Sequence, residues 1–144
     1  MLKLFANGVM VKRYFLDTSF ISSLLNPDDV NHSAARAHYD LFVEEDELWV
    51  SPIVLIELLL LTKQVKGLSW TLLHDLVIVF NIETVTFDYK YINQLAEFIT
   101  NTELFLKPND YAILASTHLL KANLLTFDEK LLAVSEKTNG KTRL

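Results

Sequence analysis

The chain contains no cysteine, only three glycines and three prolines, and no unbroken apolar stretch long enough for a membrane span. The lack of cysteine excludes disulfides and thiolate metal sites, which fits a reducing cytoplasm. The scarcity of glycine and proline argues against long flexible linkers. A membrane helix needs about 20 apolar residues, and the first residues lack the pattern of a signal peptide. We therefore expect a soluble, cytoplasmic protein without membrane association.

Apolar residues, by contrast, are abundant. They make up 51% of the 144 residues, and the mean hydropathy is +0.24. A chain of this length fits one domain, which can bury roughly two-thirds of its unfolded surface. We predict a single domain over residues 1–144, in which residues 1–11 are either an N-terminal extension or the product of an upstream start. The apolar surplus indicates an interface with a partner or with a second copy.

Hydrophobic periodicity predicts strands that alternate with helices, without internal repeats. The strands are predicted at residues 12–16, 48–50, 82–86 and 123–126. The helices are predicted at residues 18–25, 31–45, 52–67, 69–80, 88–100, 109–121 and 128–136. In the helix at 31–45, six residues are expected on or near the inner face, namely Ala34, Ala35, Ala37, His38, Leu41 and Phe42. The tail at 137–144 is expected either to add an edge strand or to hang free.

Short apolar strands separated by helices are typical of an α/β fold. They favour a mainly parallel sheet of four to five strands with helices on both faces. In such open sheets, the active cleft lies beyond the carboxyl ends of the strands, where the strand order reverses. Functional residues are therefore expected immediately after strands and in the first turns of helices.

Four carboxylates stand where solubility does not explain a charge. Asp17 and Asp128 follow predicted strands, Asp110 opens a predicted helix, and Glu57 interrupts an otherwise apolar helix. Carboxylates gathered in one cleft raise one another's pKa unless a cation holds them ionised. Hard oxygen ligands without cysteine suit Mg²⁺ or Mn²⁺. We therefore predict a metal site in which Asp17 and Asp110 are the first ligands, Asp128 the next, and Glu57 acts through water.

Three hydroxyl residues lie beside these acids in the sequence, namely Thr18, Ser19 and Thr126. They are expected to form hydrogen bonds that orient the carboxylates. The chain has no excess of positive charge, since its net charge is −5. Divalent ions would neutralise the acids locally, so the overall acidity does not exclude a polyanionic substrate.

The ordered set of acidic segments resembles the motifs of the PIN-domain ribonucleases. The matching segments are Asp17-Thr18-Ser19, Glu57 within its helix, residues 109–115 and residues 124–128. The resemblance covers about residues 12–137 and is strongest to the VapC-type toxins of toxin–antitoxin pairs. It implies a PIN-like three-layer fold and a Mg²⁺- or Mn²⁺-dependent endoribonuclease in which the four acids are catalytic. It also implies an RNA substrate, a cognate antitoxin and a homodimer.

Other interpretations stay open. Asp17, Asp110 and Asp128 could each be an ordinary acid at a helix N-terminus, and Glu57 could form a structural salt bridge with a lysine or arginine. The main alternative function is a catalytically inactive PIN-like module that binds RNA or protein. An aspartyl phosphatase is a third class, although Ser19 stands where a phosphatase of the haloacid-dehalogenase type would have aspartate.

Overall fold

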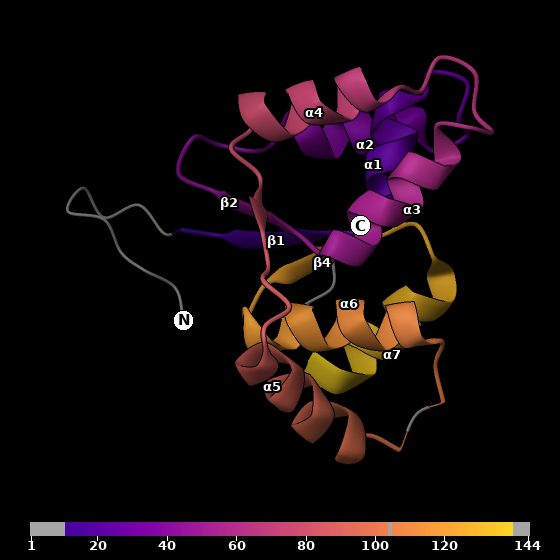
Figure 1. Cartoon of the computed structure of the whole chain (residues 1–144). Coiled ribbons are helices and arrows are strands. Elements are labelled where there is room, and N and C mark those ends of the chain that lie inside the picture. The colour runs from indigo at the N-terminus through magenta and orange to yellow at the C-terminus, as the bar shows by residue number, and fades with distance from the viewer. Residues whose placement is uncertain (1–10, 104, 140–144) are drawn as a thin grey trace.

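A parallel sheet divides the molecule into two helical layers (Figure 1). The computed structural model describes residues 11–103 and 105–139, and in this part four strands form one sheet in the order β3-β2-β1-β4. The strands are β1 (Arg13–Leu16), β2 (Glu47–Val50), β3 (Glu83–Thr84) and β4 (Asn123–Leu125). The chain builds outward from β1 to β3 and then returns to the other side of β1 with β4. The predicted α/β class and parallel sheet are confirmed.

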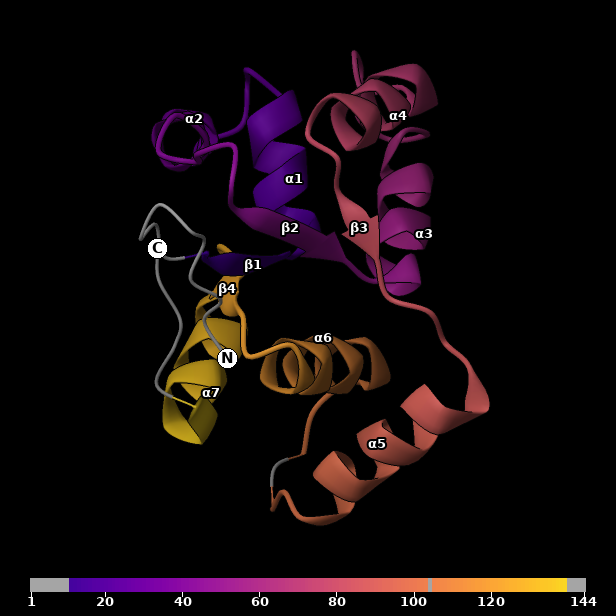
Figure 2. The ribbon, with the colours of Figure 1, turned by 90° about the vertical axis from the view of Figure 1, so that its left-hand side faces the viewer.

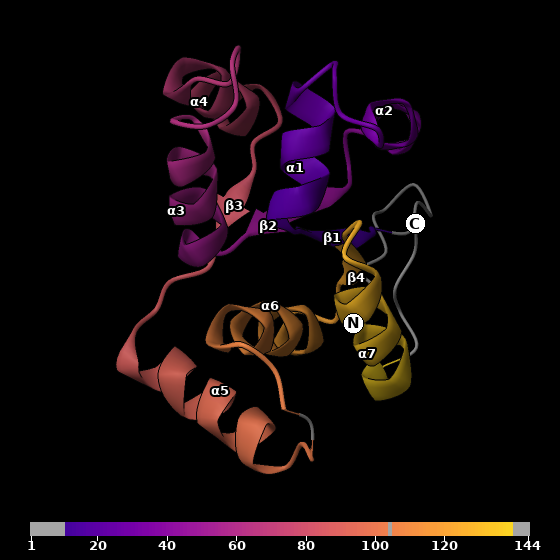
Figure 3. The same cartoon turned by 90° about the vertical axis from the view of Figure 1, so that its right-hand side faces the viewer.

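The helices cover the sheet on both faces, as Figures 2 and 3 show. One face carries α1 (Thr18–Leu25), α2 (His32–Tyr39), α3 (Pro52–Leu61) and α4 (Trp70–Val79). The other face carries α5 (Tyr89–Thr100), α6 (Pro108–Leu119) and α7 (Glu129–Asn139). None of the helices in the described ranges is long and apolar enough to cross a membrane.

The hydrophobic core lies on both faces of the central strands. Phe15 of β1 and Leu124 of β4 are fully buried, because their strands are covered by helices on each side. Phe20 and Leu58 pack against them from the first layer, and Ile113 packs from the second. This core fixes β1 and β4 as neighbours and so determines which loops meet at the carboxyl edge.

Side-chain caps set the starts of several helices. The Ser51 hydroxyl accepts a hydrogen bond from the Ile53 N–H, with Pro52 in the first helical position, and Ser69 and Asp88 cap α4 and α5. The predicted end of α3 at Gly67 is wrong, because α3 ends at Leu61. Gly67 instead adopts a positive φ of 88° in the turn before α4, a conformation that favours glycine.

The second helix is also shorter than predicted, since it ends at Tyr39 and not at residue 45. The N–H of Val43 donates to the Asp46 side chain, which closes a turn in place of another helical turn. Leu41, expected to face inward, is 74% exposed, and Ala34 and Ala37 are also exposed. Phe42 packs against the core as predicted. The local bond to Asp46 competes with helix continuation, as short polar side chains often do.

The structure describes the two chain ends only in part. Of the predicted N-terminal extension, residues 1–10 lie outside the described residues, and Val11 is buried. The helix α7 continues to Asn139, so the first residues of the predicted tail are helical and form no edge strand. Residues 140–144 lie outside the described ranges.

The strand β3 is shorter than predicted. The prediction covered residues 82–86, whereas the strand comprises only Glu83–Thr84, with one further hydrogen bond from the Val85 N–H to the Val50 carbonyl.

A pair of leucine substitutions tests this placement of the core. We expect Leu124→Ala to lower the free energy of unfolding by about 2–5 kcal/mol, because it leaves a cavity between the layers. Leu41→Ala, the same change at an exposed position, should alter it by less than about 0.5 kcal/mol. Urea unfolding followed by circular dichroism measures both. Equal losses would contradict the exposed position of Leu41.

Candidate active site at the carboxyl edge of the sheet

Asp17 occupies the junction between β1 and α1 and is only 6% exposed. Its N–H donates to the Leu125 carbonyl at 3.0 Å, so the pairing of β1 with β4 fixes its backbone. Its Oδ2 accepts hydrogen bonds from the hydroxyls of Thr126 at 2.7 Å and Ser19 at 3.0 Å. The side chain forms no capping bond to α1, which argues against an ordinary helix-capping role.

The two hydroxyls also organise the loop after β4. Ser19 Oγ accepts the Phe127 N–H at 2.9 Å, and Thr126 Oγ1 accepts the Asp128 N–H at 3.0 Å. The two hydroxyl oxygens lie 3.1 Å apart. The buried acid and the loop that carries Asp128 are therefore joined through the same two side chains. Asp128 itself caps α7, because its Oδ1 accepts the Leu131 N–H at 3.0 Å.

Glu57 extends from α3 and is held at both carboxylate oxygens. The Thr18 hydroxyl donates to Oε2, and the Asn109 side-chain amide donates to Oε1 at 2.5 Å. Both donors are neutral. The two ion pairs found in the described part of the chain, Arg13–Glu47 and His74–Asp75, do not involve Glu57. Hydrogen bonds from neutral donors therefore hold Glu57 among the described residues, and the structural salt bridge considered as an alternative is not formed there.

Asp110 lies in the first turn of α6 and is partly buried. Burial raises its pKa, and the charges of Asp128 and Asp17 raise it further. Lys107 opposes this shift, whereas Glu57 adds to it. Each of the other three predicted acids therefore lies close enough to act on Asp110, and we call these four residues the acidic cluster.

Burial likewise raises the pKa of Asp17, and this effect outweighs its hydrogen bonds from Thr126, Ser19 and the Thr18 N–H. The charge of Glu57 raises the pKa of Asp17 further. Such shifts arise where a folded chain keeps acids together at a cost to their ionised forms. An anionic cluster of this kind favours a cation.

The donor set of the acidic cluster fits a hard divalent cation in its chemistry, because it consists of carboxylate oxygens. In the positions observed, no three acid or imidazole side chains of the described residues are close enough to hold an ion. A metal held by three of these acids would therefore require a change in side-chain position. Asp110 is only partly buried, so its side chain can rotate towards the other acids without disturbing the core.

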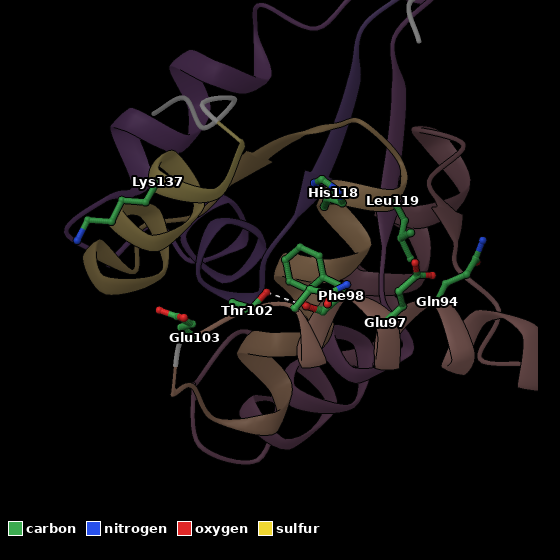
Figure 4. A pocket seen from close by; sticks show the side chains of 9 residues that line it. Gln94, Glu97, Phe98, Thr102, Glu103, His118, Leu119 and Lys137 are labelled. Carbon is green, nitrogen blue, oxygen red and sulfur yellow. Dashed lines mark hydrogen bonds between the residues drawn. The ribbon is translucent and has the colours of Figure 1, made fainter.

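A cavity of about 710 Å³ in the described part of the chain lies away from these acids. Figure 4 shows its lining residues, which include Phe98 of α5, His118 near the end of α6 and Lys137 of α7. No member of the acidic cluster lines it. Its lining side chains are mostly exposed, so it is a shallow surface depression. Asp110 lies at the opposite end of α6.

Sequence reasoning missed Asn109 as a partner of the acidic cluster. Its position immediately before Asp110 was the only available signal. The bond that it forms reaches Glu57 in another layer, and no local pattern reports such a contact. The three predicted hydroxyls do contact predicted acids: Ser19 and Thr126 bind Asp17, and Thr18 binds Glu57.

The chain is thus an α/β protein whose candidate site consists of carboxylates gathered at the carboxyl edge of a parallel sheet. The PIN domain family model matches residues 14–137. The chain therefore belongs to the PIN domain family. Comparison with curated protein sequences gave no significant match.

Three solved structures share the fold. VapC20 of Mycobacterium tuberculosis, described as a Sarcin-Ricin loop cleaving toxin, is 23% identical, with a TM-score of 0.63 over 84% of this chain and 94% of that one. VapBC2 from Rickettsia felis, bound to a promoter DNA fragment, is 20% identical, with a TM-score of 0.64 over 90% and 95%. VapBC-1 from nontypeable Haemophilus influenzae is 15% identical, with a TM-score of 0.64 over 91% and 96%. At these identities the similarity shows the fold alone.

Neutralising one acid should stabilise the metal-free protein. The folded-state pKa of Asp110 is raised above its ordinary value of 3.8. The ionisation of Asp110 therefore lowers the stability of the folded protein as the pH rises from the ordinary pKa to the raised one. We expect Asp110→Asn to melt at a higher temperature than wild type at pH 7 in EDTA. The difference should shrink as the pH is lowered towards the ordinary value.

Differential scanning calorimetry across this pH range measures the effect. Asp28→Asn, which changes an exposed acid outside the acidic cluster, serves as the matched control and should leave the melting temperature unchanged. A lower melting temperature for Asp110→Asn at pH 7 would show that Asp110 stabilises the fold.

Proposed function

We propose that this protein is a Mg²⁺- or Mn²⁺-dependent endoribonuclease, that it acts as a single domain, and that it is the toxin of a toxin–antitoxin pair. The observation that carries the proposal is the acidic cluster, in which the charges of the other three acids act on Asp110 and the charge of Glu57 also acts on Asp17. Membership of the PIN domain family supports the same reaction. The proposed substrate is RNA, and the proposed location is the cytoplasm.

In this proposal, Asp17, Glu57, Asp110 and Asp128 hold the metal. When bound, divalent ions supply a water activated for in-line attack on a phosphodiester and stabilise the leaving oxygen. The residues of the chain orient the ligands. Ser19 and Thr126 fix the direction of the Asp17 carboxylate, and Thr18 does the same for Glu57.

One cation accompanies the acids. Lys107 precedes α6 and lies close enough to Asp110 to lower its pKa. Its side chain is exposed, so it is free to meet a phosphate that approaches the site. A module that only binds RNA has no need of a buried carboxylate such as Asp17, whose burial costs free energy. The arrangement therefore supports catalysis over simple binding.

The toxin assignment and the partners rest on the fold. VapC20 is described as a toxin, and the two VapBC structures contain a VapB with the VapC. A cognate antitoxin is the corresponding partner for this chain. We also propose a homodimer that uses the exposed apolar side of α3, where Ile56 is 57% exposed beside Leu59 and Leu60.

Cleavage of RNA tests the proposed reaction. We expect the purified protein to cleave RNA in Mg²⁺ or Mn²⁺ and to lose this activity in EDTA. Asp17→Asn and Asp110→Asn should each reduce the rate at least about 100-fold, because each removes a charge that holds the metal. The control Asp28→Asn should retain wild-type activity. Cleavage that persists in EDTA, or in both well-folded active-site variants, would refute the mechanism.

The oligomeric state tests the proposed use of α3. We expect the wild type to be dimeric in size-exclusion chromatography with light scattering. Leu60→Glu should shift the protein to monomer, because it places a charge in an apolar interface. Leu41→Glu, also at an exposed leucine but outside α3, should remain dimeric. A monomeric wild type, or a dimeric Leu60→Glu variant, would contradict this surface.

A further inference from the structure

Asn109 connects the two helical layers at the acidic cluster. It lies in the first turn of α6 on one face of the sheet, and its amide donates to Glu57 of α3 on the other face. The two residues are 52 positions apart in the chain, and their atoms Nδ2 and Oε1 are 2.5 Å apart. Asn109 itself is exposed, so this bond is not forced by burial in a core.

Glu57 depends on this bond because its own helix offers no polar partner. The neighbours of Glu57 at three and four positions along α3 are all apolar. The hydroxyl of Thr18 holds Oε2, and the amide of Asn109 holds Oε1. Removal of the amide would leave one oxygen of Glu57 without a donor from α6. Each carboxylate oxygen has more than one lone pair, so both remain able to accept another ligand.

The asparagine side chain is uncharged, and this affects how the site can bind a cation. An amide fixes the Glu57 carboxylate without adding positive charge, whereas a lysine in this place would compete with an incoming cation. Asn109 also immediately precedes Asp110, so the first turn of α6 carries both an acid of the cluster and the donor that holds another. The backbone of α6 thereby sets where Glu57 lies relative to Asp110.

We propose that Asn109 is a positioning residue that holds Glu57 beside Asp110 for binding of a divalent cation. This inference rests on the proposed function, because it takes the acidic cluster as the metal site. The amide acts through Glu57 and touches neither substrate nor metal. Its contribution should therefore disappear when the carboxylate of Glu57 is removed.

Calorimetric titration with Mn²⁺ tests the role of Asn109 without reference to activity. We expect Asn109→Ala to bind Mn²⁺ about fivefold more weakly than wild type, which corresponds to about 1 kcal/mol. Asn109→Leu, which keeps the size but not the donor, should show the same loss. Asn93→Ala, at an exposed asparagine of α5, is the matched control and should bind as wild type does.

A double-mutant cycle separates positioning from a general structural effect. In the Glu57→Gln background, Asn109→Ala should weaken Mn²⁺ binding by less than about twofold, because the carboxylate that it orients is gone. Circular dichroism confirms that the variants are folded. An equal fivefold loss in both backgrounds would overturn the proposal.

The remaining outcomes separate the two hypotheses. If wild type binds Mn²⁺ and the Asn109 variants bind it equally or more tightly, the positioning role fails while the proposed function stands. If wild type neither binds Mn²⁺ nor cleaves RNA, the proposed function fails and the role of Asn109 fails with it.

Discussion

The burial of one carboxylate between two parallel strands is the constraint on which the site depends. Asp17 follows β1, and its hydroxyl partner Thr126 follows β4. They meet because the register aligns Leu16 with Leu125, one position earlier on each strand. A change of register by one residue would turn the side chains to opposite faces of the sheet. The hydrophobic packing that fixes this register therefore also positions the acid.

The site combines this fixed acid with carboxylates on more adaptable supports. Asp17 is held by the sheet, whereas Glu57 and Asp110 come from helices in opposite layers and are only partly buried. Burial of these acids costs folding free energy, and their like charges add to the cost, as the raised pKa values of Asp17 and Asp110 indicate. The apolar layers on both faces of the sheet must offset this cost. Stability that the core provides is thus partly spent at the carboxyl edge.

Local signals explain what could be predicted from the sequence. The strand ends located Asp17 and Asp128, and the helix start predicted at residue 52 matches the start of α3, because each of these signals depends on neighbouring residues. The ends of α2 and α3 were mispredicted because the chain turns directly after Tyr39 and Leu61, where no glycine or proline marks the end of a helix. The bond between Asn109 and Glu57 was missed for a different reason. It depends on how two helices from opposite layers approach each other, and the sequence pattern contains no measure of that distance.

The acidity of the chain and the proposed polyanionic substrate become compatible through linkage. Within the described residues, Lys107 is the one cation whose charge acts on the pKa of Asp110, so the acidic cluster alone repels phosphate. A divalent ion held by the cluster would offset part of this negative charge and would offer phosphate oxygens a ligand. By thermodynamic reciprocity, RNA that binds through the ion must also tighten the binding of the ion. Neutral donors such as Asn109 and Thr18 suit this arrangement, because they fix the carboxylates and leave their full negative charge for the cation.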